Sequence, residues 1–575
     1  MKDLCEREDR IVEKDPKERL QNYLNERDEA IPVFDLKKID KPKLRKLLKK
    51  RKGNRSCGID YIDGYSIKLA APLIEDILLH LVNLTIEFSQ YPHLWKVNKV
   101  SPQYKKGDKT LGENWRPVTD IVFVSKLAEA AVYEQTEEHF SMNNLWHPNH
   151  HGFKANHSTA TAISQIYDFW IQAAEKTELT AALLLDLSAA FDVVNHEILL
   201  DKLKLYNFSP KTIAWFRSYL EGRKQVVVVE SKTSDPKEIG NQGVPQGSLL
   251  GPILFIIFYN DFPYVREEGS SIVYADDDTD NVSDKDPHLL QQKIQKEADL
   301  STSWVHDNKL VCSGSKTKLL VIGTKELRRS KLVNPNISIE IIVDGHPVRE
   351  SESERLLGVL INNVMTWEHH LYGNEDHKGL VQKLSQRANI IWKLSKMMPK
   401  QKLKMISEGI FFSLLNYCIE VYGNVWGLNT YDDQVRNSIA YTKEDNRKLQ
   451  ILVNKVLRSL TGRDRDTPVT VLHDQSGQLS VHQRCAMYTL TNVHKAVNQK
   501  LPAYSYYKLK PNPVQKNQQI SRVDYKLSLS RGSYYYRGSK LYSQVPDQIT
   551  QITNQTSFKK AAKKWVLMSI PVLPP

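Results

Sequence analysis

The sequence has few cysteines and no long hydrophobic run. The five cysteines lie far apart, without a CxxC pair or a matching pair of histidines: Cys5, Cys57, Cys312, Cys418 and Cys485. This pattern indicates neither a disulfide framework nor a zinc site, and it suits a reducing compartment. The longest apolar runs, such as PILFIIF at 252–258, are too short to cross a bilayer, and the charged N-terminus lacks a signal-peptide core. We therefore expect a soluble intracellular protein of the nucleus and cytoplasm, with no membrane segment.

The composition is otherwise that of an ordinary globular protein with excess positive charge. The 575 residues include 80 Lys+Arg and 67 Asp+Glu, which gives a net charge of +13. A chain of this length exceeds the roughly 100–200 residues of one domain, so several domains are expected. The charge favours a polyanionic partner such as RNA or DNA.

A basic segment near the N-terminus shows this charge most clearly. KPKLRKLLKKRKGNR, at 41–55, holds nine basic residues and no acidic one, with Leu44, Leu47 and Leu48 at helical spacing. We expect a short amphipathic helix here. Its cations would suit phosphate contact or nuclear import, and a solvated helix face is the alternative.

The stretch YADDDTD, at 274–280, contains four carboxylates in seven residues. Such a cluster stays ionised only if it is open to water or holds cations. A calcium loop is excluded because its sixth position would be Asn281 rather than glycine, and its twelfth would be Pro287 rather than glutamate. A solvated acidic loop remains the alternative to a metal site.

Two apolar segments predict buried strands that end in carboxylates. One is 181–185 in LTAALLLDLSAAF, which ends at Asp186, and the other is 271–275 in SIVYADDD. Adjacent residues of a strand point to opposite faces, so Asp276 and Asp277 can act together only at a hairpin tip. The following DDTDNVSDKD has almost no apolar residue, and we expect it to make a poor buried strand.

The rest of the chain carries weaker signals. Alternation predicts a strand near 97–104 that leads to a turn at 105–108, and strands again follow Gly314. Beyond Met398 the pattern is mostly helical, with basic and aromatic residues interleaved in SYYYRGSKLYSQVP and SFKKAAKKWVL. Such mixtures suit stacking and phosphate contact along nucleic acid, or plain packing.

Metal-assisted phosphoryl transfer needs carboxylates from two strands around two divalent ions. Asp186, with Asp276 and Asp277, meets that need. In NQGVPQGSLLGPILF, two glycines and Gln246 precede an apolar helix, which would let the backbone approach a nucleotide or template closely.

Taken together, these segments resemble the reverse transcriptase of a non-LTR retrotransposon of the LINE type, jockey-like. LLLDLSAAFDVVNHEILLDKL, GVPQGSLLGPILFIIFYND and VYADD resemble the palm motifs in order and spacing. LWKVNKVSPQYKKGD, NWRPV and HHGFKANHSTATAI resemble the fingers motifs, and CSGSKTKLLVIG and RLLGVLINNVMTWEHHL resemble the segments that follow the palm motifs. The resemblance runs from about residue 40 to the end.

The resemblance implies an RNA-directed DNA polymerase with Mg²⁺, or Mn²⁺ in its place, as cofactor. Asp186, Asp276 and Asp277 would be catalytic and would hold the metals, together with the carbonyl of Leu187. The partners would be an RNA template, a DNA primer or target, and dNTPs. Oligomeric state is left open.

The resemblance also implies a nucleotide-binding set. Arg116 would neutralise the incoming triphosphate, helped by Lys105 or Lys106, and Lys316 would steady the leaving pyrophosphate. Phe191 matches the steric gate that excludes a ribose 2′-hydroxyl, although an aromatic core residue is its simpler reading. Gln246 and Gly247 match the position that packs against the nascent base pair.

The expected fold class is α+β, with a mixed α/β palm in a right-hand polymerase. We expect a charged segment at 1–40, an N-terminal extension and fingers at 41–150, and fingers and palm with the catalytic motifs at 151–345. A thumb at 346–440 and a helical basic and aromatic region at 441–575 complete the expected arrangement.

The sequence departs from relatives of this kind in three respects. The polar run after Asp278 replaces an apolar strand, no room for the N-terminal endonuclease exists before residue 40, and the terminal Cys-rich knuckle is absent. We therefore expect a chain that does not cut its own primer site. A degenerate or domesticated remnant that only binds nucleic acid, and an RNA-directed RNA polymerase, remain as alternatives.

Overall fold

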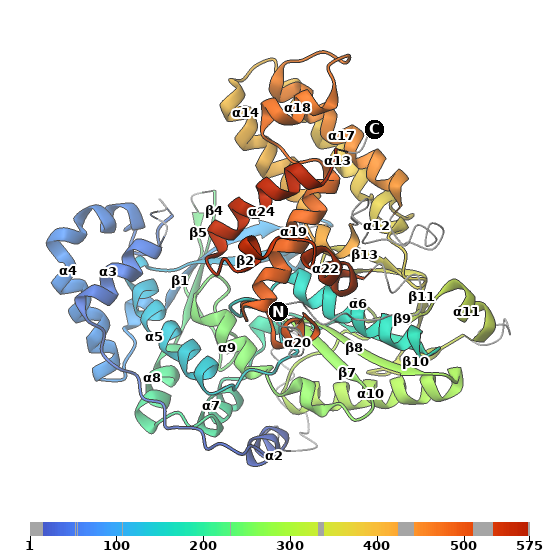
Figure 1. Ribbon diagram of the computed structural model, residues 1–575. Helices are drawn as coiled ribbons and strands as arrows, with labels where there is room; N and C mark the ends of the chain where they lie inside the picture. Colours follow the sequence, from blue (N-terminus) through green and yellow to red (C-terminus); the bar gives the residue numbers. More distant parts are fainter. Residues whose placement is uncertain are drawn as a thin grey trace. The chain divides into compact units, whose positions relative to one another are not determined.

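The chain folds into two compact units in the computed structural model (Figure 1). The structure describes residues 15, 17–51, 53, 56–105, 107–230, 232–331, 338–423, 442–509 and 533–572. The first unit comprises the described residues of 1–153, 186–267 and 298–313. The second comprises those of 154–185, 268–297 and 314–575. The chain therefore passes repeatedly between the two units.

The N-terminal part of the first unit is helical. Its helices are α2 (Glu18–Asn25), α3 (Lys41–Lys50), α4 (Gly64–Glu87) and α5 (Phe123–Met142), and α3, α4 and α5 pack on one another. The predicted basic helix is α3, which begins at its N-cap Asp40 and buries all three of its leucines.

Most cations of α3 contact acidic side chains of its neighbours. Lys41 pairs with Asp76, and Lys43 and Lys50 both pair with Glu134, each with 2.6 Å between nitrogen and oxygen. Exposed pairs of this kind add little stability. These ion pairs involve lysines that the sequence pattern had suggested for phosphate contact.

Helix α4 is the one helix among the described residues that is long and apolar enough to cross a bilayer by length and composition alone. Along its length, away from both ends, this helix carries the charged residues Lys68, Glu75 and Asp76. Leu78 and Val82 are buried on the side that packs within the unit.

A small sheet forms the next layer of the first unit. Its strand order is β2-β1-β4-β5, with β6 also paired to β4. The strands are β1 (Val97–Tyr104), β2 (Trp115–Asp120), β4 (Lys224–Val229), β5 (Lys232–Thr233) and β6 (Lys237–Glu238). β1 matches the predicted strand at both ends, and it pairs antiparallel with β2 and parallel with β4. Short 3₁₀ turns η1 (His93–Lys96) and η2 (Gly112–Asn114) precede β1 and β2.

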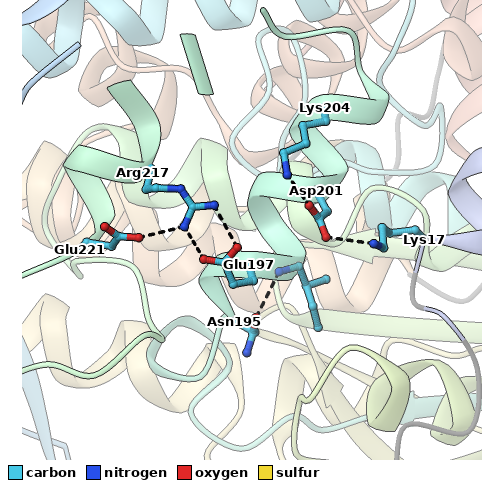
Figure 2. Close-up of polar contacts among 8 residues, drawn as sticks. Lys17, Asn195, Glu197, Asp201, Lys204, Arg217 and Glu221 are labelled. Carbon is cyan, nitrogen blue, oxygen red and sulfur yellow. Dashed lines mark hydrogen bonds and ion pairs between the residues drawn. The ribbon is translucent and has the colours of Figure 1, made fainter. Parts of the chain in front are cut away.

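The first unit also contains the helices α7 (His196–Leu205), α8 (Pro210–Leu220) and α9 (Leu250–Phe258). Figure 2 shows polar contacts around α7, where Asn195 caps the helix by accepting from the Ile198 N–H at 3.1 Å. Arg217 of α8 donates to both oxygens of Glu197, and this hydrogen bonding holds the pKa of Glu197 below its ordinary value. These contacts fix α7 against α8.

Inside the first unit, α7 is anchored by a buried ion pair. Lys202 donates to Asp261 at 2.8 Å and to the Phe258 carbonyl at 2.7 Å, and neither charged side chain is exposed beyond 1%. Asp261 lies at the start of η4 (Phe262–Val265) and also accepts from the indole N–H of Trp304 at 3.2 Å. A buried pair with this many partners fixes geometry more than it adds stability.

The second unit is built on a six-stranded sheet of order β10-β11-β9-β3-β8-β7. Its strands are β3 (Leu179–Leu185), β7 (Ser270–Tyr274), β8 (Asp277–Asp284), β9 (Lys318–Ile322), β10 (Glu340–Val343) and β11 (His346–Ser351). Helix α6 (Thr159–Glu175) packs on β3, β7 and β8, as Figure 1 shows. β3 is a central strand with antiparallel partners on both sides, as its continuous apolar run predicts.

The polar run after the acidic cluster forms a complete strand, so the expectation that it makes a poor buried strand was wrong. β8 pairs with β3 on one side and β7 on the other, and residues 278–282 are buried. Two of its polar side chains accept hydrogen bonds from neighbouring elements: Ser271 donates to Asp278, and the Trp170 indole of α6 donates to Asn281 Oδ1 at 2.7 Å. Hydrogen bonding thus replaces the apolar contacts that this strand lacks.

Helices cover the remainder of the second unit. Those before residue 424 are α11 (Lys325–Lys331), α12 (Glu368–Tyr372), α13 (Leu380–Leu394), α14 (Lys400–Ser407), α15 (Ser413–Asn416) and α16 (Ile419–Tyr422). α10 (Pro287–Asp307) contributes its first part to this unit and its last part to the other, and β12 (Ser353–Leu356) pairs with β13 (Val359–Asn362). A π-turn, η5 (Glu408–Phe412), separates α14 from α15.

The C-terminal helices share one core with α6 and the sheet. They are α17 (Lys443–Thr461), α18 (Val469–Ser476), α19 (Val481–Val497), α20 (Ala503–Leu509), α22 (Tyr534–Tyr542), α23 (Asp547–Thr550) and α24 (Gln555–Ser569). Tyr534, Tyr535 and Tyr542 are buried, as are Phe558 and Trp565. For these aromatic side chains, packing is the reading that the structure supports.

Mixed sheets with helices on them confirm the predicted α+β class. The predicted boundaries between fingers, palm, thumb and C-terminal region stay predictions.

Candidate active site

The acidic cluster lies at a tight hairpin between β7 and β8. Tyr274 pairs with Asp277, so Ala275 and Asp276 form a two-residue turn. Ala275 has a φ of 61°, a left-handed conformation that costs a non-glycine residue about 1–2 kcal/mol. Asp276 is half-buried and Asp277 is exposed. The hairpin tip predicted for these two carboxylates is confirmed.

The strand β3 delivers Asp186 to a defined position. Its last residue, Leu185, pairs with Asp278 of β8, one residue beyond Asp277, and Asp186 follows Leu185 directly in the chain. The Ser313 N–H donates to the Asp186 carbonyl at 2.8 Å, and the Ser188 N–H donates to Val311 at 2.9 Å. The backbone on both sides of Leu187 is therefore fixed.

The backbone carbonyl of Leu187 takes no part in the hydrogen bonds that join this segment to residues 311–313. Leu187 and Cys312 form an isolated antiparallel bridge that uses the groups of the flanking residues. Since N–H and C=O groups alternate between the two edges of a strand, the Leu187 carbonyl points to the opposite edge. That orientation suits the predicted role of this carbonyl as an oxygen ligand.

The donor chemistry of these residues fits a hard divalent cation. Carboxylates and a backbone carbonyl are the ligands that Mg²⁺ and Mn²⁺ prefer. Among the residues that the structure describes, no group of three or more histidine, cysteine, aspartate or glutamate side chains is gathered so that it could hold a metal ion. Asp186 belongs to the first unit, whereas Asp276 and Asp277 belong to the second.

The predicted gate residue lies in an aromatic contact within the first unit. Phe191 follows Ala190 in the turn η3 (Ala190–Asp192) and stacks on Phe255 of α9, with 4.3 Å between ring centroids. Phe153 meets its other side edge-on at 6.2 Å. Phe191 remains half-buried, so part of the ring is exposed.

Gln246 is held beside this turn. Its side-chain amide donates to both carboxylate oxygens of Asp192 at 3.0 Å, and its backbone carbonyl accepts from the Thr119 N–H at 2.9 Å. Burial raises the pKa of Asp192, and the hydrogen bond from Gln246 opposes that shift. The loop is thus tied to β2 and to η3.

The backbone conformation and the close contact at Gly247 require glycine at this position of the loop. Its φ is 115°, and a Cβ on it would lie 2.6 Å from the Thr119 carbonyl oxygen. A side chain cannot be accommodated without moving backbone. The close approach that the structure shows at Gly247 is to β2, and the expected approach of this loop to a nucleotide or template stays a prediction.

The predicted triphosphate cations lie on the β1–β2 hairpin. Arg116 is exposed and pairs across the hairpin with Gln103, and Lys105 follows β1 and is also exposed. Lys106 lies outside the described residues. Lys316 is exposed in the turn before β9 in the second unit.

A hollow of about 550 Å³ lies on the same small sheet. Trp115 and Pro117 line it together with Pro102, Val227 and Val229. Because side chains alternate along a strand, Arg116 lies on the face opposite Trp115 and Pro117. This hollow is therefore not the site of the predicted triphosphate cations.

Comparisons with known proteins identify the family. Residues 104–394 match the family described as reverse transcriptase (RNA-dependent DNA polymerase), and this segment contains every site residue predicted above. The chain belongs to the reverse transcriptase family. Enzymes of this family generally depend on divalent metal ions, which suits the donor set described above.

Several curated relatives carry names from non-LTR transposons of Drosophila melanogaster. The chain is 25% identical to the probable RNA-directed DNA polymerase from transposon X-element, over 74% of this chain and 44% of the relative. It is 24% identical to the RNA-directed DNA polymerase from mobile element jockey, over 73% of this chain and 43% of the relative. For the probable RNA-directed DNA polymerase from transposon BS the identity is 24%, over 76% and 46%. The chain thus spans less than half the length of these relatives.

The structure adds residues to the candidate site that the sequence did not indicate. Asp192 holds Gln246, and Glu129 of α5 accepts from the Leu249 N–H at 2.7 Å, next to the start of α9. Burial raises the pKa of Glu129. Asp192 sits beside Phe191 in the same motif, which could have drawn attention to it, whereas Glu129 lies in an unremarked helical segment.

Proposed function

We propose that this chain is an RNA-directed DNA polymerase of a non-LTR retrotransposon, which extends a DNA primer on an RNA template. The observation that carries the proposal is the pair of strand ends that offer carboxylates. The β7–β8 turn holds Asp276 and Asp277. Strand β3 ends at Leu185, which pairs with Asp278, and Asp186 follows Leu185 in the chain. The match to the reverse transcriptase family and the names of the relatives support it.

In this proposal Asp186 and Asp276 hold two Mg²⁺ ions, with Mn²⁺ as a substitute. Asp277 completes the carboxylate set, and the Leu187 carbonyl adds an oxygen ligand. When bound, the ions lower the pKa of the attacking 3′-hydroxyl and stabilise the leaving phosphate oxygens. Within the first unit the bridge at Leu187 fixes the backbone around Asp186, and within the second unit the tight turn fixes the backbone of Asp276.

The nucleotide would be bound by the residues that the resemblance implies. Arg116, with Lys105 or Lys106, would neutralise the triphosphate, and Lys316 would act on the pyrophosphate. Phe191 would exclude a ribose 2′-hydroxyl because its stacking on Phe255 restricts the ring. Gln246, oriented by Asp192, and Gly247 would present a flat backbone surface to the nascent base pair.

We assign the fingers to 41–150, the fingers and palm to 151–345, and the thumb to 346–440, with the helical region at 441–575 gripping nucleic acid. The exposed basic residues of that region include four lysines on α24: Lys559, Lys560, Lys563 and Lys564. The polymerase would act on RNA templates in the nucleus or cytoplasm, without binding a membrane.

A binding-only remnant is the principal rival. Its main support was the polar run after Asp278, which cast doubt on the return strand of the hairpin. The structure gives that run a complete strand with two strand partners, and its buried Asn281 accepts a hydrogen bond from Trp170. This observation favours the polymerase.

The experiment that tests the proposal is primer extension on an RNA template with Mg²⁺, comparing dNTPs with NTPs in the native chain and in Phe191→Ala. We expect extension with dNTPs only, and a gain of NTP use in the variant. NTP use by the native chain would indicate an RNA-directed RNA polymerase. Salt-sensitive RNA binding without extension would indicate the remnant.

A further inference from the structure

A column of stacked aromatic rings runs from Phe191 into the core of the first unit. Phe191 stacks on Phe255 with 4.3 Å between ring centroids, and Phe255 stacks on Tyr259 with 5.7 Å. Tyr259 in turn stacks on Phe262 with 4.6 Å. The three inner residues are fully buried, whereas Phe191 is half-buried. Because a protein core is close-packed, the ring of Phe191 has no room to move inwards.

The backbone of Phe191 is also held in place. The Val244 N–H donates to the Phe191 carbonyl at 2.8 Å, and the Asp192 N–H donates to the Ala189 carbonyl at 2.7 Å. The Asp192 side chain accepts from Gln246. The movement that would enlarge the space beside Phe191 is therefore a tilt of its ring away from Phe255.

Phe153 contacts the ring of Phe191 from a turn of the same unit. The two ring planes are at 87°, with 6.2 Å between their centroids, and Phe153 is 47% exposed. Phe191 thus has one aromatic neighbour in the core, Phe255, and another at the surface. Edge-to-face contacts of this kind are favourable, and they restrict the orientation of both rings.

The backbone of Phe153 has a conformation that a bulky residue rarely adopts. Its φ is 53°, in the left-handed region that glycine, asparagine and aspartate favour. Stability gives little reason for phenylalanine here, since much of the ring is exposed and glycine would remove the strain. Residues that keep a strained backbone gather at functional sites. The contact of Phe153 with Phe191 supplies the function that such strain indicates.

We propose that Phe153 is a positioning residue that holds the Phe191 ring against Phe255 and so sets how strictly ribonucleotides are excluded. The inference rests on the proposed function, in which Phe191 excludes the ribose 2′-hydroxyl. Without the Phe153 ring, Phe191 would tilt away from Phe255 and leave room for one more oxygen atom. Phe153 therefore acts on specificity through Phe191 rather than by touching the nucleotide.

The test is single-nucleotide incorporation into a DNA primer on an RNA template, with kcat/KM measured for dNTP and for NTP. Phe153→Gly should raise the use of NTP relative to dNTP at least about tenfold, while kcat/KM for dNTP stays within about threefold of the native value. Phe153→Leu keeps an apolar side chain of similar reach, so it should keep most of the native discrimination.

Tyr61→Gly is the matched control. Tyr61 is another aromatic residue of the first unit with a left-handed φ, 56°, and it is 74% exposed. This substitution removes the same kind of strain and an exposed ring, and the discrimination between dNTP and NTP should stay native. Thermal unfolding separates positioning from packing. In Phe153→Gly the relief of strain offsets the loss of a partly exposed ring, so Tm should stay within about 3 °C of the native value.

A double variant tests whether Phe153 acts through Phe191. In a Phe191→Ala chain, adding Phe153→Gly should raise NTP use no further, because the ring that Phe153 restrains is gone. Unchanged discrimination in Phe153→Gly, an equal gain in Tyr61→Gly, additive gains in the double variant, or a gain accompanied by a larger loss of Tm would overturn this inference alone, since dNTP incorporation would still uphold the proposed function. A folded native chain that incorporates neither nucleotide would overturn the proposed function and this inference with it.

Discussion

Replacing Gly247 by alanine should damage both stability and activity. Gly247 has a φ of 115°, outside the region that alanine adopts readily, and the new methyl group would lie 2.6 Å from the Thr119 carbonyl oxygen. Such a conformation costs about 1–3 kcal/mol, and displacing a packed neighbour adds about 1–3 kcal/mol. Partial relaxation of the loop leaves an expected loss of about 2–4 kcal/mol, or about 5–10 °C in Tm.

The matched control is Gly222→Ala. Gly222 also has a positive φ, 64°, but nothing lies within 4 Å of a Cβ placed there, so its loss should be about 1 kcal/mol. Thermal unfolding gives the Tm of both variants. Primer extension then reports whether Gln246 is displaced, because its backbone carbonyl accepts from the Thr119 N–H next to the clash. A Gly247→Ala variant with native Tm and native extension would refute the reasoning about this loop.

Two further predictions concern buried charged or titratable groups. Lys202→Ala should lower the free energy of unfolding in urea by about 3–5 kcal/mol, because it leaves Asp261 buried without its cation. The double variant Lys202→Met with Asp261→Leu should recover most of that loss. Equal losses for the single and double variants would contradict this prediction. Burial lowers the pKa of His370 to about 4, so the folded state disfavours the proton that the unfolded chain binds below about pH 6.5. This part of the stability is present above pH 6.5 and is lost as the pH falls towards 4, at about 1.4 kcal/mol per pH unit. His370→Phe should therefore lose about 2 kcal/mol less than the native chain between pH 7 and pH 5, and an unchanged loss would contradict the assignment.

The strands that carry the site could be predicted because they bury apolar side chains. The run at 181–185 became β3 and the run at 271–275 became β7, each within two residues. The hairpin tip at Asp276 and Asp277 followed from strand alternation alone. Local pattern was sufficient for these elements.

The polar strand β8 could not be predicted in this way. Alternation rules treat each polar side chain as solvent-exposed, whereas Asn281 is buried and takes its hydrogen bond from Trp170, 111 residues away in sequence. The pairing of Gln246 with Asp192 and the burial of Tyr534 and Tyr535 likewise depend on contacts that form only in the folded chain.

The central claim is that the carboxylates at the β7–β8 turn serve metal-dependent nucleotide transfer. The most direct test is single-nucleotide incorporation into a DNA primer on an RNA template with Mg²⁺, comparing Asp276→Asn with Asp284→Asn. Both substitutions remove one charge from the β7–β8 hairpin, but Asp284 lies at the far end of β8, paired with Lys293 at 3.0 Å. The account predicts that Asp284→Asn retains incorporation and that Asp276→Asn loses it by about three orders of magnitude or more, as expected when a metal ligand is removed. Native incorporation by a folded Asp276→Asn chain would contradict it.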